Sequence, residues 1–220
     1  MITTELVGKL QTNEWDELIR FISFHSPRIR KDVFFVLDVI RKNDKNLTGL
    51  NRKEIHRQAF PMDEFDDKRI RYILTDINKF IFDYFSYKQL MANSAERNAL
   101  LLSELANRNC KKTFEKTYNS QLKRLNESGR ADSDTLYYRY QLHALKAKAE
   151  LGSGKRSSDV FEESSLYLDN YFVAKKLQIS AEKINLNYIL KKEWNDPFLE
   201  TILEQIDLGL FDSSPYIKLY

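Results

Sequence analysis

Only a few segments of this chain combine residue types that could do chemistry, and the first is Gly152-Ser153-Gly154-Lys155. A glycine-rich turn that ends in lysine can surround a phosphate group with backbone N–H groups. A phosphate-binding loop also requires a glycine five residues before the Gly-Lys pair and a serine or threonine after it. Those two positions hold Ala149 and Arg156. We therefore interpret the segment as a turn between two helices.

The usual metal ligands and nucleophiles do not form a recognisable set. Cys110 falls on an apolar helical stripe, so we expect it in the core rather than at a reactive site. The acidic run that precedes a long helix lacks the glycine and the distal glutamate of an EF-hand loop: Asp63, Glu64, Asp66 and Asp67. The histidines are too scattered to share one metal ion: His25, His56 and His143. We expect no catalytic residue, no metal site, no cofactor and no enzymatic activity.

Basic side chains gather in the first third of the chain, where a three-helix DNA-binding module could use them to contact phosphates. They are Arg52, Lys53, Arg57, Lys68, Arg69 and Arg71. Acidic residues are interleaved with them, and these would repel a duplex. A DNA-binding regulator with a helix-turn-helix-like module in residues 28–90 is therefore the alternative hypothesis, and nucleic acid is an unlikely partner on this pattern.

Tyrosines are frequent in the second half, and tyrosine is enriched at protein interfaces. Six of them could line a concave surface that binds a protein or peptide: Tyr137, Tyr138, Tyr140, Tyr167, Tyr171 and Tyr188. The same rings could instead pack inside helical hairpins. Both interpretations stay open at this point.

Composition and charge exclude several classes of protein. The chain has 220 residues, of which 42% are hydrophobic and 30% charged, so it is too apolar to be disordered. Its net charge of +3 is spread evenly, unlike that of a dedicated nucleic-acid binder. Residues 1–5 do not resemble a signal peptide, and no apolar run is long enough to span a membrane. We expect a cytoplasmic protein of unknown oligomeric state.

Glycine and proline are scarce, which allows long helices: residues 62–128 contain neither. In the first half, apolar spacing predicts helices over Glu14–Phe24 and Pro27–Lys42, the latter starting at Ser26-Pro27. Asn43–Thr48 is predicted to be a polar loop. Asn51 is predicted to cap a short helix that Pro61 ends, and Asp66 or Asp67 to start a long one.

Very long helices are predicted beyond residue 91. One stripe runs from Ala99 through Cys110 to Leu125 and indicates a single helix of about 26 residues, or about 39 Å. Gly129 is expected to end it in a left-handed conformation. Two further helices are predicted over 132–151 and 160–190. A break without glycine or proline is expected near Ala92-Asn93-Ser94.

These elements predict an all-α protein. Residues 1–91 are expected to form a short-helix bundle, and residues 94–220 a long-helix hairpin array of α-solenoid type. The final segment, Ser214–Tyr220, has the pattern of a capped helix start, so we expect the array to be truncated there.

Two segments carry a family resemblance. Glu14–Phe24 followed by Ser26-Pro27, and Ala59-Phe60-Pro61 followed by Asp66–Ile77, resemble the signatures of a group of uncharacterised all-helical bacterial proteins. The resemblance covers about residues 5–90 and implies fold context without an activity. The second half is also loosely similar to tetratricopeptide arrays, although it lacks their 34-residue period. We therefore expect a non-catalytic scaffold for protein–protein interaction.

Overall fold

The computed structural model describes residues 2–26, 30–130, 132–152, 154, 158–191, 196–211 and 217. Over these residues the chain is helical and contains no β-strand, which confirms the all-α fold class. The chain forms two compact units, Met1–Ala92 and Asn93–Tyr220. Within the described residues, no helix combines the length and the apolar character needed to cross a bilayer.

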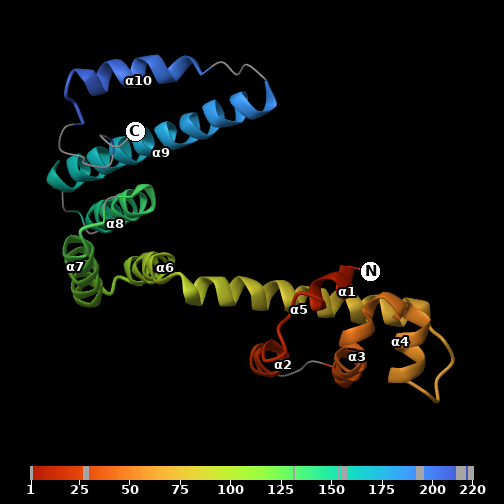
Figure 1. The fold of residues 1–220 in the computed structure, drawn as a ribbon. Coiled ribbons are helices and arrows are strands. Elements are labelled where there is room, and N and C mark those ends of the chain that lie inside the picture. Colours follow the sequence, from red (N-terminus) through yellow and green to blue (C-terminus); the bar gives the residue numbers. More distant parts are fainter. Residues whose placement is uncertain are drawn as a thin grey trace. The chain divides into compact units, whose positions relative to one another are not determined.

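The first unit packs its shorter helices against one long helix, α5 (Asp67–Ala92). Figure 1 shows four of them gathered around α5: α1 (Ile2–Val7), α2 (Glu14–His25), α3 (Lys31–Lys42) and α4 (Arg52–Ala59). The short 3-10 helix η1 (Asp44–Gly49) contacts α3 and α1. The buried face of α5 recurs every three or four residues, as the sequence predicts: Ile70, Ile73, Leu74, Ile77, Ile81 and Tyr84.

Capping side chains set two helix starts in this unit. Asn51 Oδ1 accepts a hydrogen bond from the backbone N–H of Glu54 at 3.0 Å, which confirms the predicted cap of α4. That helix ends at Ala59, just before Pro61, again as predicted. Asp66 Oδ1 accepts from the N–H of Arg69 at 2.9 Å and so caps the start of α5.

Two predictions for this unit are wrong. The third helix begins at Lys31 and not at Ser26-Pro27. Ser26 instead closes α2, because its N–H donates to the carbonyl oxygen of Ile22 at 2.9 Å; Pro27 lies outside the described residues. The expected loop Asn43–Thr48 forms the 3-10 helix η1, where the N–H of Asn46 donates to the Asn43 carbonyl at 2.8 Å.

The second unit contains α6 (Ser94–Asn107), α7 (Lys111–Ser128), α8 (Ser133–Gly152), α9 (Ser158–Leu190) and α10 (Pro197–Asp207). Figure 1 shows α8 between the α6–α7 hairpin and α9, and α8 contacts all three helices. The predicted helices over 132–151 and 160–190 are confirmed. Gly129 follows α7 with a φ of 61°, in the predicted left-handed conformation.

The predicted break between α5 and α6 is confirmed, and a single asparagine makes it. Asn93 is extended, with a ψ of 91°, and its Oδ1 accepts from the N–H of Glu96 at 3.1 Å. The Asn93 side chain accepts a hydrogen bond from an N–H group that has no partner within the first turn of α6. This cap separates α5 from α6 without glycine or proline.

The single helix predicted over Ala99–Leu125 is wrong, because the chain turns at Asn109. This residue has a φ of 58°, a conformation that asparagine tolerates better than most residues. The backbone N–H of Asn109 donates to the carbonyl oxygen of Ala106 at 3.0 Å, and the N–H of Cys110 donates to the carbonyl oxygen of Leu105 at 2.9 Å. This pair of bonds is the Schellman pattern that closes a helix. Cys110 is consequently exposed at the start of α7, and not in the core.

The start of α10 is attached to α9 through Asp196. Its carboxylate pairs with Lys176, accepts a hydrogen bond from Ser180 Oγ at 2.7 Å and lies 3.5 Å from Lys183. Lys176 and Ser180 lower the pKa of Asp196 to about 2. The contact is therefore charged at every ordinary pH, and is lost only as the pH falls through that low value.

We expect Asp196→Asn to release α10 from α9. The amide cannot replace the carboxylate that both lysines contact, so backbone hydrogen exchange at pH 7 should become faster in α10 and stay unchanged in α8. Asp207→Asn, at the far end of α10, is the matched control and should leave both helices unchanged. Equal exchange in the two variants would contradict this attachment.

Candidate partner surfaces

A groove of about 440 Å³ lies between α6 and α8. We call it the tyrosine groove. Its α6 wall carries Glu96, Ala99, Leu100 and Ser103, and its α8 wall carries Tyr137, Tyr140, Gln141, Ala144, Leu145 and Lys148. Each set repeats every three or four residues and so occupies one face of its helix. The groove is a pair of matched helix faces rather than a loop-built site.

The side chains that line the groove include small, apolar and charged residues. Ala99 and Ala144 place small side chains on opposing walls, which keeps the groove open between the two helices. Leu100 is 55% exposed and gives an apolar wall beside them. Glu96 and Lys148 add opposite charges. Such a surface suits a ligand that is apolar along one side and charged at its ends.

Two of the predicted tyrosines, Tyr137 and Tyr140, line this groove, and a third, Tyr171, packs against Tyr137 from α9. The ring of Tyr137 lies 6.2 Å from that of Tyr140 and 4.9 Å from that of Tyr171. Tilted rings at these separations attract one another through their quadrupoles. Tyr137 is nevertheless 42% exposed, so the cluster presents a fixed aromatic surface to solvent.

The other three predicted tyrosines lie elsewhere. Tyr138 is buried against α7, where its hydroxyl donates to Gln121 Oε1 at 3.4 Å, and burial raises its pKa. Tyr167 stacks on His143 with ring centres 4.9 Å apart. Tyr188 is 91% exposed near the end of α9. The six tyrosines therefore do not form one surface.

A buried polar cluster around His143 was not predicted from the sequence. Its Nδ1 lies 3.1 Å from the hydroxyl of Tyr118 and 2.9 Å from a carboxylate oxygen of Glu163. Burial lowers the pKa of His143, against the opposing effect of Glu163, and burial raises the pKa of Tyr118 well above its usual range. Both groups are therefore neutral near pH 7.

The arrangement of these three side chains joins α7, α8 and α9. Although tyrosine, histidine and glutamate can transfer protons, only 2% of His143 is exposed, so a substrate has no access to the imidazole. Nearby, Lys146 on α8 pairs with Glu115 of α7 and lies 3.4 Å from Glu150. We interpret the cluster as a structural connection between helices.

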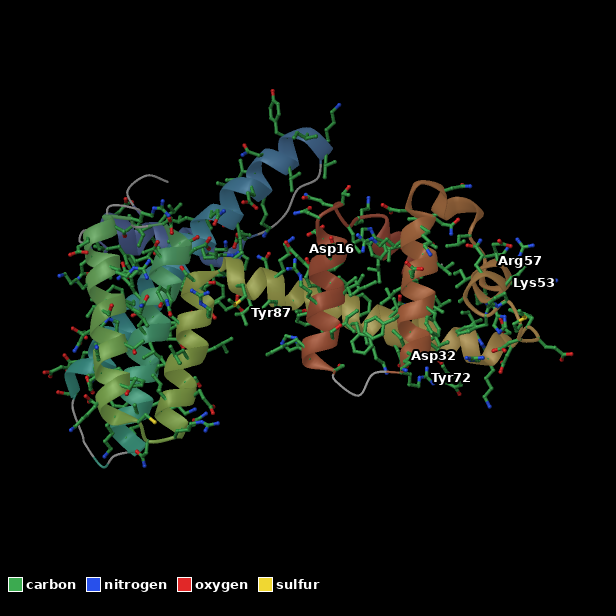
Figure 2. The ribbon with its side chains drawn as sticks, turned by 90° about the horizontal axis from the view of Figure 1, so that it is seen from below. Asp16, Asp32, Lys53, Arg57, Tyr72 and Tyr87 are labelled. Atoms are coloured by element: carbon green, nitrogen blue, oxygen red, sulfur yellow. The ribbon has the colours of Figure 1, made fainter. Side chains whose placement is uncertain are left out.

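The predicted nucleic-acid contacts are mostly engaged with acidic side chains. Arg52 and Arg71 lie 3.1 Å and 3.3 Å from Asp67, and Arg57 lies 2.7 Å from Glu54. Arg69 lies 2.7 Å from Asp63 and stacks over the ring of Phe60. Lys53 and Lys68 have no such ion pair in the described part of the chain. Figure 2 shows Lys53 and Arg57 on the outer side of α4.

Contacts within the first unit account for three of the four residues in the acidic run before α5. Asp63 and Asp67 form ion pairs with arginine side chains, and Asp66 caps the start of α5. Among the described residues, no three histidine, cysteine or acidic side chains are grouped as metal ligands. In the Gly152-Ser153-Gly154-Lys155 segment, Gly152 is the last residue of α8, and Ser153 and Lys155 lie outside the described residues.

An aromatic hollow of about 720 Å³ lies between α2 and α5 in the first unit. It was not predicted from the sequence, because its rings come from two helices: Phe21, Phe24 and His25 from α2, and Tyr84 and Tyr87 from α5. The rings of Phe21 and Tyr87 are 5.3 Å apart, and Figure 2 places Tyr87 where α5 passes α2. Tyr84 donates to Glu17 at 2.8 Å, and burial with this bond raises its pKa to about 12.

No family model, curated protein or solved structure matches this chain. Any function must therefore be argued from the geometry of these surfaces.

Proposed function

We propose that this chain is a non-catalytic helical scaffold that binds a protein partner, and that the tyrosine groove receives an amphipathic helix of that partner. The groove itself carries the proposal, because two helix faces with an apolar floor form the receptor surface used in helix-in-groove recognition. An amphipathic helix could lie along the groove and contact its walls with the side chains at every third or fourth position.

The tyrosines support this mode of binding. Tyr137 is held between Tyr140 and Tyr171, so little side-chain entropy remains to be lost when a partner binds. Large, rigid aromatic side chains of this kind carry much of the binding energy at interfaces. The opposite charges of Glu96 and Lys148 would select the direction in which the partner helix lies.

We also propose that α6 to α9 form two stacked hairpins of solenoid type. A second hollow supports this arrangement, because Ser94 and Ala95 from the start of α6 line it together with Thr135 and Tyr138 from the start of α8. The two helices therefore run parallel, as the first helices of successive repeats do. The tyrosine groove would then be the space between two equivalent helices.

The DNA-binding alternative over residues 28–90 has less support. Its arginines already contact Asp63, Asp67 and Glu54, and a phosphate backbone would have to displace these contacts. Family membership, cytoplasmic location and the absence of an enzymatic activity stay predictions.

A peptide selection tests the proposed function. We expect a displayed library of amphipathic helices, selected on the full chain, to yield binders in the micromolar range. Replacing Tyr137 and Tyr140 together with alanine should weaken these binders at least tenfold, about 1.4 kcal/mol, as measured by fluorescence anisotropy.

Tyr188→Ala is the matched control, because Tyr188 is an exposed tyrosine outside the groove. It should leave the affinity of the selected peptides unchanged. A selection that yields no helical binder, or binders equally affected by both variants, would refute the tyrosine groove as the partner site.

A further inference from the structure

The outer face of α9 carries an apolar stripe that the described residues of the second unit leave exposed. Its members are 41–58% exposed: Phe161, Leu168, Phe172, Ile179, Leu186 and Leu190. They follow one another at intervals of seven or four residues. Since each residue turns the helix by about 100°, all six side chains fall within an arc of about 40°. We call this set the α9 stripe.

The opposite face of the same helix is already buried. Val173, Ala174 and Leu177 pack with Leu136 of α8 and Ile202 of α10. A helix that is apolar on two opposite faces is normally covered on both. The α9 stripe extends over about 44 Å of helix, far more than the scattered apolar residues of an ordinary surface.

Charge along α9 indicates what covers the stripe. Its first half, residues 158–174, carries four acidic residues and no basic one: Asp159, Glu162, Glu163 and Asp169. Its second half, residues 175–190, carries Lys175, Lys176 and Lys183 and a single acid, Glu182. Two copies of α9 placed antiparallel would bring each acidic half against a basic half.

Other occupants fit these charges less well. A parallel second copy would place acidic half against acidic half. An anionic membrane surface would be repelled by Glu162 and Asp169, which flank the stripe, because membrane-bound amphipathic helices carry basic residues on their polar face. Asp159 and Glu163 lie on the opposite face of α9, where Glu163 contacts His143. Some of the basic charge is shared within the chain, since Lys176 and Lys183 also contact Asp196.

We propose that two copies of this chain associate antiparallel through their α9 stripes, about a twofold axis that crosses the middle of the helix. The same patch then serves both copies, as in other twofold dimers. A contact about 44 Å long and about 10 Å wide lies at the small end of specific interfaces, so we expect a dissociation constant in the micromolar range.

Sedimentation equilibrium on the full chain tests the association. From about 1 to 200 μM we expect a monomer–dimer equilibrium. Replacing both Phe172 and Ile179 with glutamate should make the chain monomeric throughout. Its helix content and melting temperature should equal those of the parent chain at about 1 μM, where the parent is also monomeric, because both side chains face solvent in the monomer. Leu101→Glu, at an exposed leucine of α6, is the control and should dimerise like the parent chain. A parent chain that stays monomeric at every concentration overturns the proposal, whether or not it binds anionic vesicles.

Cross-linking tests the direction. With Cys110 replaced by serine, the chain carries no thiol, and single cysteines can be placed at the two ends of the α9 stripe. A mixture of Phe161→Cys and Leu190→Cys chains should be linked by a short bismaleimide, whereas Phe161→Cys chains alone should not. Cross-linking of Phe161→Cys chains with one another would show a parallel contact and overturn the antiparallel arrangement.

Discussion

Replacing Ile77 with alanine lowers the free energy of unfolding of the first unit by about 2–5 kcal/mol. Ile77 is fully buried at the centre of the α5 face, among side chains contributed by the helices around it. Truncation removes its apolar contacts and leaves a cavity that packed helices cannot fully close. This loss is a large part of the stability expected of a domain of this size.

Hydrogen exchange measured in increasing urea shows where that loss falls. Protection should decrease throughout residues 2–92 and stay unchanged in the second unit, because each unit has its own apolar core. Tyr72→Ala on the same helix is the control, since this side chain is 59% exposed and its removal should change stability by no more than about 0.5 kcal/mol. An equal loss of protection in both units would show that they unfold together.

The second unit should lose stability as the pH falls below about 6.5, the ordinary pKa of histidine. Burial lowers the pKa of His143 in the folded chain, so the unfolded chain binds a proton more readily. The contribution of neutral His143 is fully present above pH 6.5 and decreases between that value and the lower folded pKa. One proton taken up on unfolding corresponds to a slope of about 1.4 kcal/mol per pH unit.

Urea unfolding of the second unit between pH 8 and pH 5 measures this slope. His143→Phe removes the titrating group and keeps an aromatic ring against Tyr167, so the slope should become flatter even if the variant is less stable. His25→Phe alters an exposed histidine of the first unit and should leave the slope unchanged. A slope that persists in His143→Phe would assign the effect to another group.

Two asparagines show how far the sequence could predict the helix boundaries. The break at Asn93 is predicted because the stripe through Ile70–Tyr84 belongs with the first bundle, whereas the stripe through Ala99–Leu125 begins the second group of helices. Asn109 was missed because the apolar residues of α6 and α7 keep helical spacing across the turn: both helices pack on one cluster that includes Leu102 and Phe114. Periodicity reports which residues are buried, and here it could not report that the chain reverses between them.

The candidate surfaces depended on information that the sequence does not contain. Tyr137 and Tyr138 are neighbours in the chain, yet one faces the tyrosine groove and the other packs against α7. To predict which of the two faces the groove, one must know how α8 is rotated about its axis relative to α6. The His143 cluster needs three helices to be placed together, and no spacing along the chain marks Tyr118, His143 and Glu163 as partners.

The turn at Asn109 also gives the protein a natural point of attachment for a probe. It moves the chain's single thiol, Cys110, out of the core and onto the surface at the start of α7. A maleimide dye would therefore label the unmodified chain at one position, next to a hollow of about 180 Å³ that Phe114 and Ala149 help to line. Its fluorescence would follow the second unit alone through unfolding or partner binding, without an engineered cysteine.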